Sequence, residues 1–83
     1  MTDEEILEKI REILSESFEI APETVFPETK LFEDLDLDSI DAVDLAIRVQ
    51  EMTGKRIKPE DFKSVRSVRD VVDTARRLMA VPD

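Results

Sequence analysis

Several residue types on which protein chemistry often depends are missing from this chain of 83 residues. It has no cysteine, histidine, tryptophan or tyrosine, and only one glycine. Without cysteine there is no disulfide and no thiol nucleophile, and without cysteine or histidine a zinc site with the usual ligands is excluded. The side chain that most often transfers protons near neutral pH is absent, and one glycine cannot form a glycine-rich phosphate-binding loop. The sequence therefore predicts that the protein is not an enzyme.

Basic residues are also scarce, and this limits the classes of partner. The chain has 12 lysine and arginine residues against 21 aspartate and glutamate residues, a formal net charge of −9. Because binding to phosphates needs a surplus of positive charge, we expect no nucleic-acid partner. No apolar run has the length of a membrane span, so we expect none. The acidic start after Met1 is unlike a signal or transit peptide, which makes a cytoplasmic location the default.

The residues that are present are sufficient for a small folded domain. Apolar residues make up 41% of the chain, and its length fits one domain over residues 1–83. Apolar residues recur at helical spacing over residues 3–17, from about residue 38 to Gly54, and over residues 68–80. We therefore expect an all-α fold, a small four-helix bundle with three main helices and a short third one.

Capping residues mark the ends of these segments. Thr2 and Glu5 have the spacing of a capping box before the first helix, and Ser67 can cap the last one. Gly54 is placed to end the second helix, and Pro59 suits the first position of the short third helix. The long first loop over residues 18–37 has scattered apolar residues, which predict that it is pinned onto the core.

The second helix has apolar residues on two opposite faces. With 100° per residue, Ile40, Val43 and Ile47 lie opposite the stripe that contains Leu45 and Val49. One interpretation is that this helix is central and packs on both sides. The other is that the second face is a docking surface, because acidic residues surround it and residues 33–44 contain six acids and no base. Its expected partner is basic and has an apolar groove.

Ser39 lies at the start of this helix, where serine is usually a cap. If Asp38 caps the helix and Asp41 reaches back to it, Ser39 takes the first helical position and its hydroxyl is not needed for capping. The backbone N–H groups and the positive end of the helix dipole favour an attached phosphate at that place. Both interpretations, a cap and an attachment site, stay open on spacing alone.

Residues 34–38 also resemble the start of an EF-hand calcium loop, with an acid at every second position. The sixth position of such a loop is Ser39 instead of glycine, and the twelfth is Leu45 instead of glutamate. We therefore predict no metal site, and a calcium sensor is the weakest of the functional alternatives. A further alternative is an interaction or regulatory domain whose acidic face docks a partner.

Residues 35–45, with the sequence LDLDSIDAVDL, resemble the attachment site of the acyl carrier protein family. The resemblance covers almost the whole chain, and it implies a four-helix bundle with up-down topology. It also implies that Ser39 carries a 4′-phosphopantetheine, transferred from coenzyme A by a phosphopantetheinyl transferase. Acyl groups are then held as thioesters on the thiol of this arm and presented to fatty-acid or polyketide-type biosynthetic enzymes.

The resemblance assigns further residues by analogy. Partners with basic docking patches, such as an acyl synthetase or a ketosynthase, would meet a recognition surface on a monomeric carrier. This surface would consist of Asp38, Ile40, Asp41, Val43, Asp44 and Ile47. The acyl chain would lie in a pocket lined by Leu45, Ala46, Val49, Ile57, Phe62, Val65, Val68 and Val72.

The sequence departs from the family pattern in three respects. Many members have glycine where this chain has Asp36, and Phe62 is bulky for a pocket wall. The last third of the chain is basic, with Lys55, Arg56, Lys58, Lys63, Arg66 and Arg69. These features suggest a specialised carrier of a secondary pathway, such as one that makes aryl polyenes. Peptidyl carriers usually have glycine before the serine and less acidity, so they fit less well.

Overall fold

The computed structural model describes residues 2–58, 60, 62 and 64–80. In this part of the chain the elements are α1 (Asp3–Phe18), the 3-10 helix η1 (Pro22–Thr24), α2 (Ser39–Thr53) and α4 (Val68–Ala80). The described residues form no β-strand, only an isolated bridge between Lys30 and Ser67. The all-α prediction is confirmed. Within the same residues, no helix is both long and apolar enough to cross a membrane.

The predicted short third helix falls partly on residues that the structure does not describe. Pro59, Asp61 and Lys63 lie outside the described residues, whereas Glu60 and Phe62 are helical. The number of helices in the bundle therefore stays a prediction beyond the three main ones.

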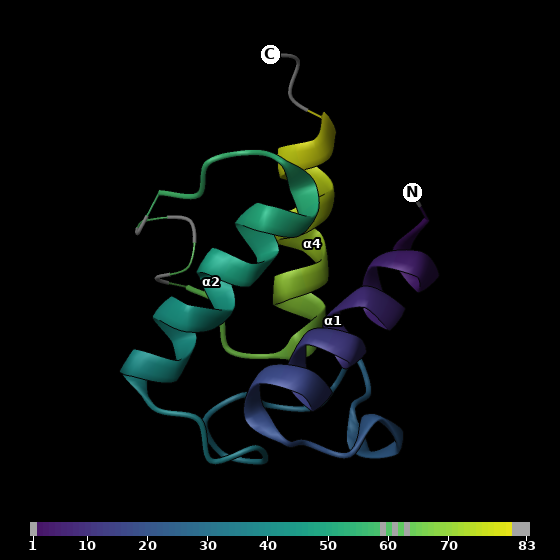
Figure 1. Cartoon of the computed structure of the whole chain (residues 1–83), viewed down its shortest axis with the longest axis vertical. Coiled ribbons are helices and arrows are strands. Elements are labelled where there is room, and N and C mark those ends of the chain that lie inside the picture. Colours follow the sequence, from purple (N-terminus) through teal and green to yellow (C-terminus); the bar gives the residue numbers. More distant parts are fainter. Residues whose placement is uncertain (1, 59, 61, 63, 81–83) are drawn as a thin grey trace.

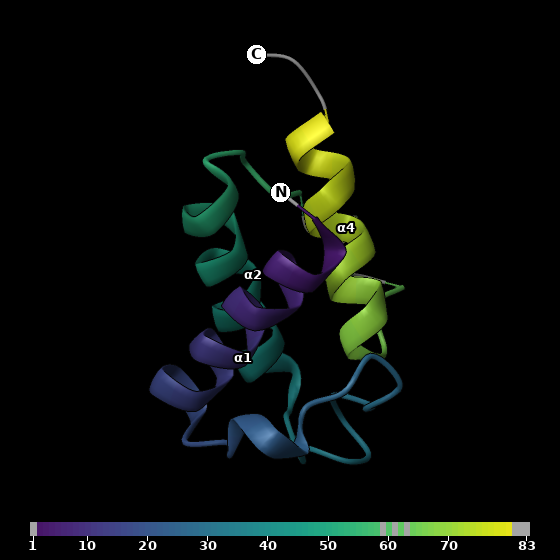
Figure 2. The ribbon, with the colours of Figure 1, turned by 90° about the vertical axis from the view of Figure 1, so that its right-hand side faces the viewer.

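The three main helices pack against one another, with α1 running opposite to both α2 and α4 (Figures 1 and 2). In both views α1 descends, while α2 and α4 ascend. The loop between α1 and α2 crosses the lower end of the bundle, and the connection from α2 to α4 returns from the upper end to the lower one. The start of α2 is thus placed at the lower end, next to the long loop.

The core is built from one face of each helix, as the apolar stripes predicted. The first helix contributes Ile6, Ile10 and Leu14, which are fully buried. The second contributes Leu45 and Val49, and the last helix contributes Val68, Val71, Val72 and Ala75. Burial of these side chains is the main source of stability, at roughly 1.5–3 kcal/mol for each large one.

The long loop is held against this core, as its scattered apolar residues predicted. Val25, Leu31 and Leu37 are buried in the core cluster. The N–H of Leu31 donates to the carbonyl of Arg66 over 2.8 Å, and Nε of Arg11 donates to the carbonyl of Val25 over 2.9 Å. These contacts fix the loop that leads into α2.

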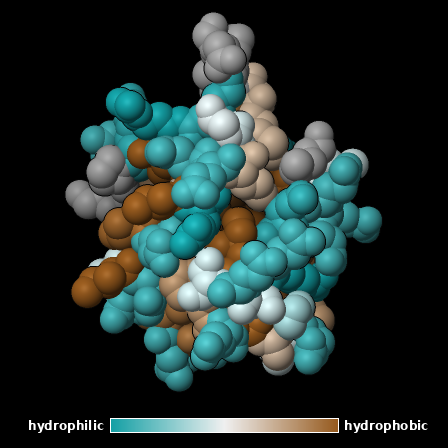
Figure 3. Space-filling model, viewed as in Figure 1, coloured by the Kyte–Doolittle hydropathy of each residue, from teal (hydrophilic) through white to brown (hydrophobic). Residues whose placement is uncertain are grey.

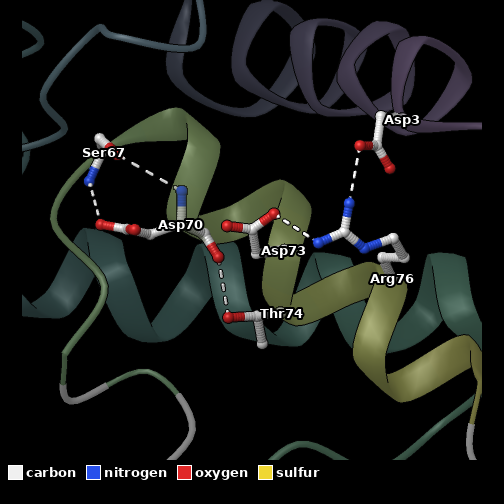
Figure 4. A network of polar contacts seen from close by, with 6 residues as sticks. All are labelled: Asp3, Ser67, Asp70, Asp73, Thr74 and Arg76. Carbon is white, nitrogen blue, oxygen red and sulfur yellow. Dashed lines mark hydrogen bonds and ion pairs between the residues drawn. The ribbon is translucent and has the colours of Figure 1, made fainter.

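Charged side chains connect α1 to α4 on the surface of the bundle (Figure 4). One nitrogen of the Arg76 guanidinium lies 2.7 Å from a carboxylate oxygen of Asp3 and the other lies 2.9 Å from Asp73. Asp3 belongs to the first turn of α1, so this ion pair joins two helices that are far apart in sequence. Exposed pairs of this kind contribute less than about 1 kcal/mol.

Helix α4 begins with a reciprocal cap between Ser67 and Asp70, as the sequence predicted for Ser67. The N–H of Asp70 donates to Oγ of Ser67 over 3.3 Å, and the carboxylate of Asp70 accepts from the N–H groups of Arg66 and Ser67 at 3.0 and 3.1 Å. The bond from the Arg66 N–H is the main reason that the pKa of Asp70 lies below its ordinary value, and the bonds from Ser67 add to it.

This cap gives a testable dependence of stability on pH. Because the pKa of Asp70 is lower in the folded state, this carboxylate stabilises the fold at pH values above its ordinary pKa of about 3.9. That stabilisation is lost as the pH falls through the folded-state pKa. We expect Asp70→Asn to cost stability at neutral pH, with a difference from wild type that shrinks below about pH 4. Urea unfolding of wild type and Asp70→Asn, from neutral pH to below about pH 4, measures the difference in the free energy of unfolding. A difference that does not change with pH would contradict the prediction.

Candidate functional site

The start of α2 is capped by two aspartates on either side of Ser39. The N–H of Asp41 donates to Oδ1 of Asp38 over 2.9 Å, and Oδ2 of Asp41 accepts from the N–H of Asp38 over 3.1 Å. Asp38 is the N-cap and has extended backbone angles, so Ser39 is the first residue of the helix. This is the arrangement that the sequence suggested for a serine that is not itself the cap.

The Ser39 hydroxyl is consequently not used by the helix end. Ser39 is exposed, and its side chain forms no hydrogen bond with any described residue. Ser67 provides the contrast within the same chain, because its Oγ accepts the N–H of Asp70 and caps α4. Two serines at helix starts thus differ in role, and the Ser39 hydroxyl is the one that the helix cap leaves unused.

The turn before Ser39 is held in a conformation that favours glycine. Asp36 has a φ of 56°, in the left-handed region, where a side chain costs roughly 1 kcal/mol. The next residue, Leu37, is buried, and its N–H donates to the carbonyl of Leu31 over 3.1 Å. The anchored Leu37 fixes the direction in which the chain enters α2, and Asp36 takes the strained angle that this requires.

Replacing Asp36 with glycine should therefore stabilise the protein. We expect Asp36→Gly to raise the free energy of unfolding by about 0.5–1 kcal/mol, because glycine adopts positive φ without a steric cost. Asp36→Ala is the matched control, since it removes the same charge but keeps the Cβ atom. Equal stabilities of the two variants, measured by urea unfolding, would show that charge and not backbone strain decides the effect.

The second apolar face of α2 is exposed. The exposed fractions of Ile40, Val43 and Ile47 are 77%, 60% and 48%. The alternative that α2 packs on both sides is therefore wrong for these three side chains. Hydrophobic surface gathers on the left side of the space-filling view, over α2 (Figure 3).

Acidic groups lie along this exposed face, and one basic side chain offsets part of their charge. Nε of Arg48 lies 3.9 Å from Oδ1 of Asp44, and its guanidinium also lies 4.0 Å from Glu51. Asp38 and Asp41, one turn earlier, contribute to the helix cap as well as to the surface charge. The start of α2 is thus an apolar strip with carboxylates beside it.

A groove of about 430 Å³ runs beside Ser39, between α2 and the segment that follows it. Its wall is mostly apolar and includes residues from the long loop, from α2 and from the segment after Gly54. The lining residues are Phe32, Ser39, Ala42, Val43, Ala46, Ile47, Gln50, Ile57, Lys58 and Phe62.

The structure divides the predicted acyl-pocket residues into two groups. Ala46, Ile57 and Phe62 line the groove. The other five, in contrast, are buried in the core, and they are Leu45, Val49, Val65, Val68 and Val72. Of the predicted partner surface, Val43 and Ile47 also line the groove, so the two predicted sets meet along its edge.

Four lining residues were not predicted: Phe32, Ala42, Gln50 and Lys58. Two of them could have been found from the sequence, because Ala42 and Gln50 lie three and eleven residues after Ser39 on one helical stripe. Phe32 and Lys58 come from loops whose course the sequence does not specify.

Two of the three acids that resemble a calcium loop, Asp34 and Asp38, accept backbone hydrogen bonds in the loop and at the helix start. The carboxylates of Asp34, Asp38 and Asp41 accept backbone hydrogen bonds from Lys30, Asp41 and Asp38. No group of three or more acidic side chains in the described part of the chain is arranged to hold a metal ion.

Comparisons with known proteins find relatives along almost the whole chain. Residues 8–75 match the family model for a phosphopantetheine attachment site. The chain is 65% identical over 80 residues to acyl carrier protein 2 of Ralstonia nicotianae, covering 96% of this chain and 99% of that protein. It is 38% identical to the acyl carrier protein of Thermosynechococcus vestitus, with the same coverage of both chains.

A solved structure shows the same fold. The crystal structure of an acyl carrier protein from Thermotoga maritima matches with a TM-score of 0.82 and 31% identity, covering 93% of this chain and 89% of that one. The chain therefore belongs to the acyl carrier protein family, whose members carry a 4′-phosphopantetheine prosthetic group and are carriers instead of catalysts.

Proposed function

We propose that Ser39 is the residue to which the 4′-phosphopantetheine of this carrier is attached. The observation that carries the proposal is the exposed Ser39 hydroxyl, which the helix cap leaves unused, at the edge of an apolar groove. The backbone N–H groups at the start of α2 favour the phosphate. Asp38 and Asp41 oppose a free anion there, whereas a covalent phosphodiester is held in spite of their charge.

The groove gives a carrier of this kind a place for its cargo. Ala46, Ile57 and Phe62 offer an apolar wall next to the attachment point, and burial of a hydrocarbon chain there is favourable by about 0.8 kcal/mol for each CH₂ group. When the arm is bound, its thiol supplies the thioester bond, which a chain without cysteine cannot supply. The residues of this chain attach the arm and shelter the cargo.

The exposed face of α2 is the proposed docking surface for partner enzymes. Ile40 and Val43 offer apolar contact, and Asp38, Asp41 and Asp44 offer negative charge to a basic patch. The partners would be a phosphopantetheinyl transferase and acyl-processing enzymes such as an acyl synthetase and a ketosynthase. In this proposal, residues 1–83 form one cytoplasmic, monomeric acyl-carrier domain with a four-helix bundle.

Intact mass spectrometry tests the attachment. The purified protein is incubated with coenzyme A and a promiscuous phosphopantetheinyl transferase, and the expected result is a gain of one phosphopantetheine. Fragmentation of the modified peptide should place the group on Ser39 and not on the other serines, which are Ser15, Ser17, Ser64 and Ser67. No gain of mass, or a gain on another serine, would refute the proposal and favour an interaction domain in which Ser39 is structural.

A further inference from the structure

Gln50 is a polar side chain in the mostly apolar wall of the groove. It lies eleven residues after Ser39, about 16 Å further along the axis of α2 at about 1.5 Å per residue. Its neighbours in the groove wall, Ala46, Ile47 and Ile57, are apolar. Because Gln50 is only half-buried and lines the groove, its amide can contact whatever the groove holds.

The orientation of this amide is fixed by the segment that follows α2. The backbone N–H of Ile57 donates to Oε1 of Gln50 over 2.9 Å. Because an N–H group can only donate, the amide oxygen must face Ile57, and the Nε2 amino group lies on the other branch of the amide. This amino group donates to no described residue.

We propose that Gln50 makes the groove selective for acyl chains that carry an oxygen substituent. In this assignment, which rests on the proposed attachment at Ser39, Nε2 donates a hydrogen bond to an oxo or hydroxyl group on the chain. A saturated chain removes water from Nε2 and offers no acceptor in return. A chain with an oxygen at the right depth replaces the lost bond, so it is held more firmly than a saturated chain of equal length.

Two substitutions separate the donor from the acceptor of the Gln50 amide. Gln50→Glu keeps an oxygen that can accept the N–H of Ile57, and it removes the donor. Gln50→Met has a similar length and removes both groups. If loss of the bond from Ile57 disturbs the groove, the disturbance is expected in Gln50→Met and not in Gln50→Glu. An effect seen in Gln50→Glu can then be assigned to the lost donor.

The experiment compares arms loaded with a decanoyl chain and with its 3-oxo and 5-oxo counterparts, transferred from the matching coenzyme A thioesters. Intact mass confirms that each sample is loaded, and NMR then follows the side-chain amide of Gln50 and the backbone amide of Ile57. We expect the Gln50 amide protons to shift with at least one oxo chain and not with decanoyl. We also expect the oxo chain to occupy the groove about fivefold more in wild type than in Gln50→Glu.

The outcomes distinguish this proposal from the proposed function. A sample that cannot be loaded, as seen by mass, contradicts attachment and with it both proposals. Loaded samples in which no oxo chain shifts the Gln50 resonances overturn the selectivity alone. The selectivity is also overturned if Gln50→Glu lowers the groove occupancy of decanoyl and oxo chains equally. The group that accepts from Nε2 would then belong to the prosthetic arm, which all the samples share.

Discussion

Replacement of Ser39 by alanine is expected to abolish attachment of the prosthetic group completely while leaving the fold unchanged. The variant lacks the only hydroxyl that lies at the start of α2, but Asp38 and Asp41 continue to cap the helix. We expect no gain of mass with coenzyme A and transferase, and a free energy of unfolding within about 0.5 kcal/mol of wild type.

Asp38→Ala is the structural counterpart of Ser39→Ala. It removes the N-cap and should cost about 1 kcal/mol of stability while leaving the Ser39 hydroxyl in place. Urea unfolding of both variants therefore separates the cap at Asp38 from the unused hydroxyl of Ser39. If Ser39→Ala lost as much stability as Asp38→Ala, Ser39 would have a structural role that the hydrogen bonds do not show.

Truncation of Leu45 to alanine is expected to cause a large loss of stability. Leu45 is fully buried between the helices, and removal of such a side chain costs roughly 2–5 kcal/mol through lost burial and the cavity that remains. For a domain of this size each kcal/mol lowers the melting temperature by about 4–8 °C, so the melting temperature should fall by at least about 8 °C.

Val43→Ala is the matched control for this prediction, because Val43 belongs to the same helix but lies on its exposed face. With 60% of Val43 exposed, we expect a change within about 0.5 kcal/mol. Thermal melts followed by far-UV circular dichroism compare the two variants. Similar losses in both would mean that the outer face of α2 is covered in solution, for example by the prosthetic arm or by a second copy.

Helix positions and caps could be predicted from the sequence because they depend on neighbouring residues. The capping box from Thr2 to Glu5, the cap at Ser67 and the end of α2 at Gly54 all follow from the spacing of short-range hydrogen-bonding groups and from one positive φ. The two opposite apolar faces of α2 also follow from its period, whereas the period left open whether the second face is buried.

The walls of the groove could not be predicted in the same way. Leu45 and Val49 have the composition expected of a pocket lining, yet they are buried in the core, because α2 packs on α1 and α4 through that face. Which apolar side chains line an open space depends on the path of the segment after Gly54. One contact that holds this segment joins residues seven apart, the bond from Ile57 to Gln50, which helical periodicity does not reveal.

The sequence by itself determined that the chemistry of this protein has to be borrowed. A chain without cysteine has no thiol of its own, and the serine between two capping aspartates is the place where we propose that one is attached. The tertiary structure decided what lies next to that place. Packing of α2 against the core turned Val43 and Ile47 outward, and the return of the chain beside α2 formed the groove that Gln50 lines.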